Sequence, residues 1–148
     1  MNLEKIFHPI WADFDPNNHM RHTAYNDYAA EVRVQLLTAK GYSMNKLIEL
    51  SLGPVLLVEE THFLREIRQG ETIKVDAKLL GISKDGRFWK IRHDIFNNNN
   101  KLAAYIIAEG AWIDLKTRKI KQPTQEILDQ FLSLSRSEGF HYIEKPKK

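Results

Sequence analysis

The stretch that decides the fold runs from Trp11 to Arg33 and reads WADFDPNNHMRHTAYNDYAAEVR. Its first half favours a loop, because Asp15-Pro16 and Asn17-Asn18 are turn-forming pairs and proline disfavours the helical region for the residue before it. Its second half predicts a helix, whose apolar face recurs at helical spacing in Tyr25, Tyr28, Ala29, Val32 and Leu36. A carboxylate, two amides and two imidazoles therefore lie just ahead of a helix N-terminus, an arrangement suited to chemistry on a carbonyl.

Both ends of this helix carry capping signals. Thr23 is expected to accept a hydrogen bond from a free amide of the first turn, and Asp27 adds negative charge near that positive end. Gly41 is expected to end the run in a left-handed conformation. Ser43 then predicts the cap of a second short helix over residues 44–50.

From residue 55 onward the pattern changes to extended structure. Strands are predicted over residues 55–68, 72–83, 87–96 and 101–115, separated by turns at 69–70, 84–86 and 97–100. A short first strand is expected over residues 4–12, where Pro9 confines it to an edge or an end. A final helix is predicted over about 124–136, and in the tail over 137–148 the last residues, Lys145 to Lys148, are expected to fray.

One long helix followed by a meander of strands predicts an α+β fold. The helix should pack on one face of a curved antiparallel sheet of about five strands. The chain of 148 residues is most simply a single domain, with its core over about residues 4–120. Such a sheet leaves an unpaired edge, and pairing with a second subunit is one way to cover it. We therefore expect a homodimer or a homotetramer.

The composition excludes several classes of protein. A hydrophobic fraction of 43% is ample for a folded core, yet no stretch is apolar enough and long enough to span a bilayer. Glu4 and Lys5 stand where an export signal would need an apolar segment, so a cytoplasmic location is expected. The absence of cysteine excludes disulfides, thiolate metal sites and a cysteine nucleophile. The net charge of +3 is too diffuse for nucleic-acid binding, although it could attract an anionic ligand such as coenzyme A.

Three motifs point to a known family. They are the loop Asp13-Phe14-Asp15, the tyrosine at 25 followed by Glu31-Val32-Arg33, and Thr61-His62-Phe63-Leu64-Arg65 ahead of the turn at Gly70. With them the chain resembles the hotdog-fold thioesterases, specifically the 4-hydroxybenzoyl-CoA thioesterase family and its acyl-CoA thioesterase relatives. The resemblance covers residue 4 to about residue 120. It implies the hotdog fold, hydrolysis of an acyl-CoA thioester, and a site built between subunits.

The resemblance also assigns roles in the first loop. The second aspartate, Asp15, falls on the catalytic position, as nucleophile or as general base for water. Some members have a histidine seven residues later, which falls on His22. The plant-type acyl-carrier-protein thioesterases are similar too, and their Asp-x-Asn-x-His pattern, followed by a tyrosine, falls on Asp15, Asn17, His19 and Tyr25. Asn17, His19 and His22 are thus further candidate catalytic residues, which would position water or substrate. By residue type alone, Asp15 fits an ordinary turn aspartate.

Further candidates lie along the chain. Tyr25 is expected either to line the acyl pocket or to pack in the core. Glu60 and His62 alternate to one face of their strand and are candidate substrate-binding residues, while Thr61 and Phe63 point to the other face. The first-turn amides of residues 23–25 are candidate donors to the thioester oxygen.

The ligands follow from these assignments. The resemblance makes Arg87 and Lys90 candidates to hold coenzyme A phosphates. The pair His19 and His22 could form a metal site with Asp15, but a closed site also needs a fixed further ligand. We therefore expect no metal and no cofactor.

Three other functions stay open at this stage. An acyl-carrier-protein thioesterase would use the same loop on a different thiol carrier. A hotdog enoyl-CoA hydratase would use an Asp-x-Asn-Pro-x-His motif, of which residues 15–19 are reminiscent, although the proline is elsewhere and the histidine comes one residue early. A non-catalytic acyl-CoA-binding module would keep the pocket and need no carboxylate at Asp15.

Overall fold

The computed structural model describes residues 1–144. Its elements, in chain order, are β1 (Leu3–Phe7), a 3-10 turn η1 (Trp11–Asp13), α1 (His22–Thr38), α2 (Met44–Glu49), β2 (Leu52–Phe63), β3 (Ile73–Ile82), β4 (Phe88–Phe96), β5 (Leu102–Asp114), α3 (Gln125–Leu132) and β6 (Arg136–Tyr142).

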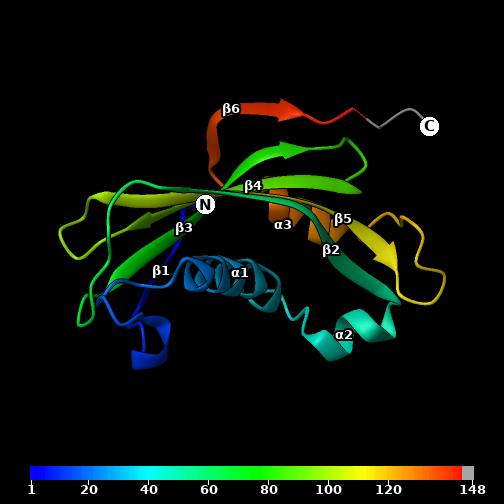
Figure 1. Cartoon of the computed structure of the whole chain (residues 1–148). Helices are drawn as coiled ribbons and strands as arrows, with labels where there is room; N and C mark the ends of the chain where they lie inside the picture. Colours follow the sequence, from blue (N-terminus) through cyan, green and yellow to red (C-terminus); the bar gives the residue numbers. More distant parts are fainter. Residues whose placement is uncertain (145–148) are drawn as a thin grey trace.

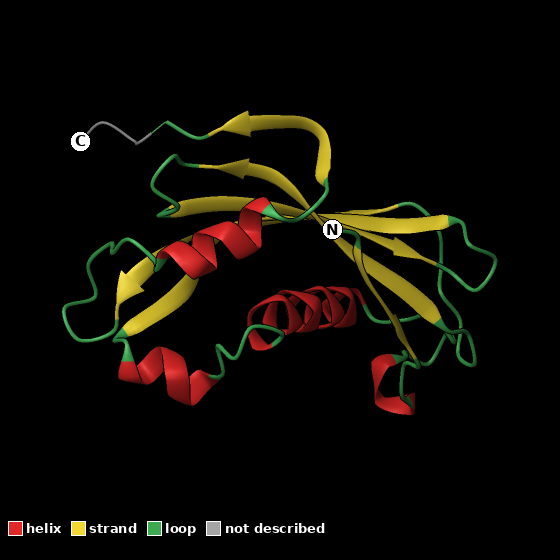
Figure 2. Ribbon diagram, turned by 180° about the vertical axis from the view of Figure 1, so that it is seen from behind, coloured by secondary structure: helices red, strands yellow, loops and turns green. Residues whose placement is uncertain are grey.

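The strands form one six-stranded sheet that curves over the central helix. Its order is β1-β3-β4-β5-β2 with antiparallel neighbours, and β6 pairs in parallel with β3. The three helices lie on one side of the sheet, with α1 along its concave face (Figures 1 and 2), while β6 extends the sheet beside the end of β3. The predicted α+β arrangement of a long helix on a curved antiparallel sheet is therefore confirmed, and β2, the last strand in the order, leaves one edge unpaired within the chain.

The core forms where α1 meets the sheet. The helix buries small and branched side chains, with Ala29 and Val32 both at 0% exposure. They belong to one cluster with aliphatic residues of three strands, namely Val75, Leu79, Ile91, Ile95 and Ile106. Each fully buried aliphatic side chain contributes about 1.5–3 kcal/mol relative to exposure. This packing fixes the helix against the sheet and so fixes the loop that precedes it.

The start of α1 differs from the prediction. Its cap residue is Arg21, which makes no side-chain cap, and Thr23 already lies inside the helix, so the prediction of a Thr23 cap is wrong. The reason is tertiary: Arg21 N–H donates to Asp13 O at 2.7 Å and Met20 N–H donates to Ile67 O at 2.8 Å. These bonds hold the chain extended up to Arg21, and the helix begins directly after it.

The other capping predictions are confirmed. Gly41 has a φ of +82° just after α1, in the left-handed region that glycine tolerates best. Ser43 accepts a hydrogen bond from Lys46 N–H at 3.2 Å and caps α2. The structure also shows a cap that was not predicted, since Thr124 accepts a hydrogen bond from Ile127 N–H at 3.2 Å and caps α3.

Several strand and helix boundaries also need correction. The first strand ends at Phe7, and a 3-10 turn follows where extended structure was predicted. β2 stops at Phe63, because the N–H groups of Leu64 and Arg65 both donate to Ala103 O, at 2.8 and 2.9 Å, and turn the chain out of the ladder. The last helix ends at Leu132, and β6 was not predicted. The expected fraying at residues 145–148 lies outside the described residues.

Candidate active site

The loop ahead of α1 is a tight turn built around one carboxylate. Asp15 N–H donates to His19 O at 2.9 Å, and Asn18, with a φ of +65°, donates its N–H to Asp15 O at 3.0 Å. The Asp15 side chain folds into the turn, where its Oδ1 atom accepts the N–H groups of Asn17 at 2.9 Å and His19 at 3.1 Å. The carboxylate is therefore held in one orientation by backbone donors.

A pocket of about 290 Å³ lies beside the first turn of α1. It is lined by His19, Met20, His22, Tyr25, Phe63, Leu64, Arg65 and Glu66. The structure thus brings together three of the predicted site residues, the two histidines and Tyr25. His22 is exposed at the first position of the helix, whereas His19 Nε2 lies 3.0 Å from Glu66 Oε2. That carboxylate orients the His19 ring.

Tyr25 serves both of the roles that the sequence left open. It lines this pocket, yet it is only 3% exposed and packs edge-on against Phe63 with ring centroids 5.1 Å apart. Burial raises the pKa of its phenol, and the nearby Glu66 charge adds to this effect. Tyr25 is therefore a neutral wall of the pocket at physiological pH.

Asp15 lines a different hollow from the histidines. This hollow, of about 440 Å³, is bordered by Trp11, Phe14, Asp15, Pro16, Asn18 and Gln69. The turn itself separates the two spaces, and the hydrogen bond from His19 N–H to Asp15 lies within this turn. The Asn17 side chain is exposed, and the contact of Asn17 with Asp15 runs through its backbone amide.

Glu60 and His62 lie on the other face of the sheet from α1. Alternation along β2 points Thr61 toward the helix, where its hydroxyl donates to Asn26 Oδ1 at 2.8 Å. His62 instead bonds Glu60 Oε2 at 2.6 Å and stacks on Tyr105 with centroids 4.4 Å apart. Glu60 and His62 are therefore not among the residues that line the pocket of His19, His22 and Tyr25, and their role in substrate binding stays a prediction.

The basic residues predicted for coenzyme A are each paired with an acid. Arg87 Nε lies 2.7 Å from Asp85 Oδ2, at the hairpin before β4. Lys90 Nζ lies 3.4 Å from Glu109 Oε1, and alternation along β4 directs Lys90 away from α1 because its neighbour Ile91 is buried beneath the sheet. Neither residue lines the pocket at the helix start.

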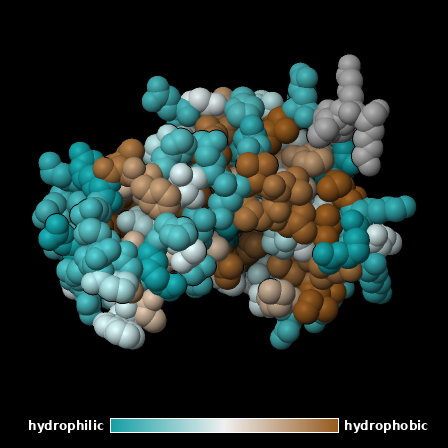
Figure 3. Space-filling model, viewed as in Figure 1, coloured by the Kyte–Doolittle hydropathy of each residue, from teal (hydrophilic) through white to brown (hydrophobic). Residues whose placement is uncertain are grey.

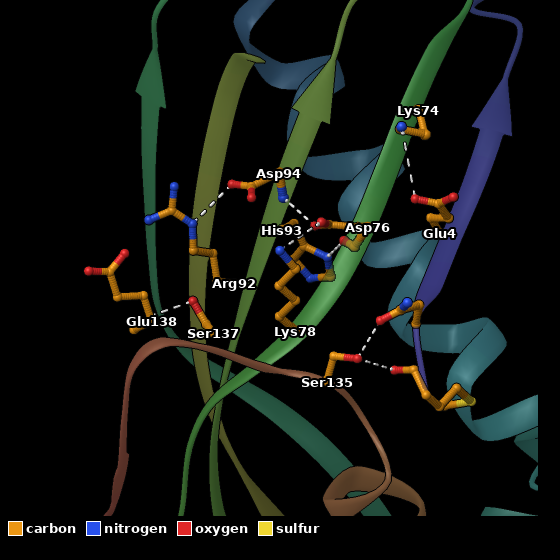
Figure 4. A network of polar contacts seen from close by, with 12 residues as sticks. Glu4, Lys74, Asp76, Lys78, Arg92, His93, Asp94, Ser135, Ser137 and Glu138 are labelled. Carbon is orange, nitrogen blue, oxygen red and sulfur yellow. Dashed lines mark hydrogen bonds and ion pairs between the residues drawn. The ribbon is translucent and has the colours of Figure 1, made fainter. Parts of the chain in front are cut away.

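The structure shows a buried polar network that the sequence analysis missed. His93 on β4 is fully buried, and its Nδ1 lies 2.7 Å from Asp76 O while its Nε2 lies 3.0 Å from Arg33 Nη1. Asp76 Oδ1 accepts Asp94 N–H at 2.7 Å (Figure 4). A signal was present, because His93 occupies an inward position in the alternation Trp89-x-Ile91-x-His93.

Within residues 1–144 no group of three or more His, Asp or Glu side chains is placed to hold a metal ion. His19 and His22 thus lack the further ligand that a closed site needs. None of the helices in this part of the chain is long and apolar enough to cross a membrane.

The curved antiparallel sheet over one long central helix is the hotdog fold. The chain belongs to the thioesterase-like superfamily, whose family model matches residues 10–131. The predicted resemblance and the predicted class of enzyme, a thioester hydrolase, are confirmed at this level. No curated protein matches the chain significantly.

Solved structures share the fold at low sequence identity. A hypothetical protein from Staphylococcus aureus, in complex with CoA, has a TM-score of 0.84 at 19% identity over 99% of this chain and 96% of its own. A 1,4-dihydroxy-2-naphthoyl-CoA thioesterase from Synechocystis has a TM-score of 0.80 at 15% identity over 90% of this chain and 98% of its own. An acyl-ACP thioesterase from Bacteroides thetaiotaomicron has a TM-score of 0.77 at 19% identity over 98% of this chain and 57% of its own. At such identities these likenesses concern the fold.

Proposed function

We propose that this chain, as a single domain, hydrolyses the thioester of an acyl-CoA to the free acid and CoA, with Asp15 as its reactive carboxylate. The observation that carries the proposal is the geometry of the turn, in which the amides of Asn17 and His19 hold one carboxylate oxygen just ahead of α1. Membership of the thioesterase-like superfamily supports the reaction. The CoA-bound relative supports the carrier.

The second carboxylate oxygen is the reacting atom in this proposal. Both backbone bonds fall on Oδ1, which leaves Oδ2 to attack the carbonyl carbon or to take a proton from water. In the first route an acyl-aspartyl anhydride forms, the CoA thiolate leaves, and water then releases the acid. In the second route water attacks directly, and the thiolate leaves with the proton that Asp15 received.

The start of α1 supplies hydrogen-bond donors for the thioester oxygen. The first amides of a helix lack intrahelical acceptors and can donate to a developing oxyanion. Ala24 N–H already donates to Arg21 O at 2.9 Å, so Thr23 N–H is the better donor among the amides predicted for this role. His22, exposed beside it, positions the thioester, and Tyr25 lines the acyl side of the pocket. Since Asp15 borders the neighbouring hollow, the proposal requires the thioester to lie across the turn, with its carbonyl carbon beside Asp15 Oδ2.

The nucleotide end of the substrate is assigned to the basic residues of β4. A CoA phosphate would have to displace Asp85 from Arg87 or Glu109 from Lys90. Both pairs are partly exposed, so each ion pair is weak enough for a doubly charged phosphate to compete with it.

The functional unit in this proposal is a homodimer or a homotetramer. β2 is the unpaired end of the sheet order, and it carries a run of exposed apolar side chains, Leu56, Leu57 and Val58. An exposed apolar edge strand favours pairing with another chain, and a second copy supplies the same edge. Antiparallel pairing of two β2 strands would cover both edges.

A panel of acyl-CoAs and acyl-carrier-protein thioesters, followed with a thiol-reactive dye, tests the reaction. We expect free CoA to appear, and Asp15→Asn to lower kcat by on the order of a hundredfold, the usual worth of a positioned base. Asp27→Asn, an exposed aspartate on α1, is the matched control and should retain activity. Incorporation of ¹⁸O into the Asp15 side chain during a single turnover in ¹⁸O-water would establish the anhydride route, because direct attack by water places ¹⁸O only in the released acid.

Other results would contradict the proposal in distinct ways. Release of thiol from the carrier protein alone would reassign the carrier. Hydration of an enoyl-CoA without thiol release would indicate a hydratase, and binding without either reaction would indicate a non-catalytic module. Near-normal turnover by folded Asp15→Asn would return Asp15 to the role of a turn residue.

A further inference from the structure

A second pocket lies at the other end of α1 from the proposed catalytic loop. It has a volume of about 190 Å³ and is lined by Ala30, Arg33, Val34, Leu37, Pro54, Val55, Leu56, Trp89, Trp112 and Phe131. Its floor is aromatic, since the Phe131 ring lies 6.1 Å from Trp89 and 6.0 Å from Trp112. Figure 3 shows hydrophobic residues gathered on the right of this face, the side on which α2 and the start of β2 lie in Figure 1. The pocket is thus an apolar space between helix and sheet.

Arg33 places a cation in this apolar space. Its Nη1 atom lies 3.0 Å from His93 Nε2. The His93 ring must be neutral there, because Nδ1 donates to Asp76 O at 2.7 Å and Nε2 accepts from the arginine. Burial of the ring lowers the pKa of His93 to about 3, which agrees with the neutral form. The histidine therefore orients the guanidinium without neutralising it.

No carboxylate of the described chain lies within ion-pair distance of Arg33. Glu59 is the acid whose charge acts on it, but Glu59 Oε1 accepts the side-chain amide of Asn26 at 2.7 Å. A guanidinium beside apolar surface is costly to leave unpaired. The pocket consequently favours an anion.

Trp89 supplies a second donor without a partner. Its Nε1 atom is buried and has no hydrogen-bond acceptor within residues 1–144. The indole cannot swing away freely, because it packs over Gly110, where even an added methyl group would come within 2.2 Å of Trp89 Cζ2. A buried indole N–H usually finds a partner, so this donor also calls for an acceptor oxygen.

We propose that this pocket binds the carboxylate of a medium-chain fatty acid. The guanidinium of Arg33 pairs with the carboxylate, the Trp89 N–H donates to one of its oxygens, and the alkyl chain packs on Trp112, Phe131 and Val34. The charge of Arg33 selects an acid over an alcohol, and the apolar walls select an alkyl chain over a polar anion. The site is separate from the Asp15 turn and does not rest on the proposed function, although such an acid is the kind of product that thioester hydrolysis releases.

Titration calorimetry with sodium octanoate tests the proposal on the full chain. We expect saturable binding of octanoate, with quenching of tryptophan fluorescence by 8-bromooctanoate because two indoles line the pocket. Arg33→Met should weaken octanoate binding at least tenfold and leave octanol binding unchanged. Trp89→Phe should weaken octanoate binding several-fold. Arg118→Met, an exposed loop arginine, is the matched control and should bind octanoate as the wild type does.

Three results would overturn the proposal. The first is the absence of octanoate binding. The second is that the wild type and Arg33→Met bind octanoate equally well and bind octanol equally well. The third is a change of oligomeric mass in Arg33→Met while octanoate binding stays unchanged. The last would assign Arg33 to a contact between copies of the chain. Arg33→Lys, which keeps the charge, serves if Arg33→Met does not fold, and should retain part of the preference for the acid. Octanoate binding by Asp15→Asn should equal that of the wild type, so that failure of this site and failure of the proposed reaction are distinguishable.

Discussion

Tyr28 in helix α1 donates a hydrogen bond of 2.5 Å to the Oδ2 atom of Asp13 in the loop before the helix. The same oxygen accepts the backbone N–H of Ile10 at 3.0 Å. Burial and the bond to Asp13 raise the pKa of Tyr28 above its ordinary value, so the hydroxyl keeps its proton. A helix side chain therefore holds the loop two residues ahead of Asp15.

Loss of this bond should loosen the loop measurably. Tyr28→Phe should lower the free energy of unfolding by about 1 kcal/mol, the usual net value of a hydrogen bond. Asp13→Asn should cost less, since the amide keeps an acceptor oxygen. A double-mutant cycle with Asp13→Ala, followed by urea denaturation, should give a coupling energy of similar size. Tyr142→Phe, an exposed residue, is the control; additive effects of Tyr28→Phe and Asp13→Ala would contradict the assignment.

The buried pair of His93 and Asp76 makes opposite contributions to acid stability. Burial lowers the pKa of His93 from 6.5 to about 3. Below pH 6.5 the unfolded chain therefore binds a proton at His93 that the folded chain does not bind, and the folded state loses stability as the pH falls. Burial raises the pKa of Asp76 from 3.8 to about 6, so the folded chain binds that proton first. The Asp76 contribution is fully present below 3.8 and is lost as pH rises through 6.

Removing the Asp76 contribution should expose the His93 contribution. Between about pH 6 and pH 4 the free energy of unfolding of Asp76→Asn should fall relative to wild type by roughly 1 kcal/mol per pH unit. The variant keeps the destabilising effect of His93 but lacks the stabilising protonation of Asp76 that offsets it in the wild type. Urea midpoints across this range measure the effect. Asn at 76 keeps an acceptor for Asp94 N–H, and Asp129→Asn at an exposed site is the control. A constant difference between Asp76→Asn and wild type at all pH values would refute this account.

Gly110 is predicted to tolerate no side chain. A methyl group there would lie 2.2 Å from Trp89 Cζ2 and 2.4 Å from Val55 O, and neither the ring nor the backbone can yield cheaply. Gly110→Ala should therefore destabilise the fold by about 3 kcal/mol or more, through overpacking. Gly53→Ala is the matched strand control, since its nearest atom is Leu115 Cδ2, at the end of a flexible side chain. Thermal unfolding of both variants tests this prediction, and equal melting temperatures of Gly110→Ala and Gly53→Ala would contradict it.

The exposed edge of β2 leads to a prediction about assembly. The β2–β5 register shifts between Leu56 and Val58, so Leu57 lies at a bulge, and it is 58% exposed. Leu57→Lys should shift the chain toward the monomer, because a charge on an edge strand opposes pairing. Light scattering at micromolar concentration measures the mass. Ile6→Lys, on the opposite edge strand β1, should leave the oligomer intact, and a monomeric wild type would exclude this assembly.

The sequence predicted the elements that obey a local period or a local turn. The hairpin at 84–86 and the cap at Ser43 needed only neighbouring residues, and both are found. β6 could not be predicted in this way, because its pairing depends on the shift in the β3 register near Leu79 and Gly81. Thr23 was misassigned for the same reason, since strand-like bonds from distant residues set where α1 begins.

The same distinction between local and distant contacts applies to the candidate site. Proximity in sequence placed Asp15 and His19 in one turn and His22 at the helix start after it, but it could not show that Asp15 and the histidines line different hollows. Alternation correctly separated Glu60 and His62 from Thr61 and Phe63. Alternation could not say which of the two faces meets the helix, because that depends on where the sheet is covered. The contact of Arg33 with His93 could not be predicted, because it joins positions 60 residues apart.

Helix α1 carries the loop anchor Tyr28, the polar bridge from Asn26 to β2, and the cation Arg33 on a single rigid rod. Inserting one residue into it would rotate everything beyond the insertion by about 100°. Such an insertion would misalign several of these contacts at once, whereas the exposed turn at residues 98–100 could lengthen without disturbing any of them. Length variation in this protein should therefore be tolerated at its hairpin tips and rejected within residues 22–38.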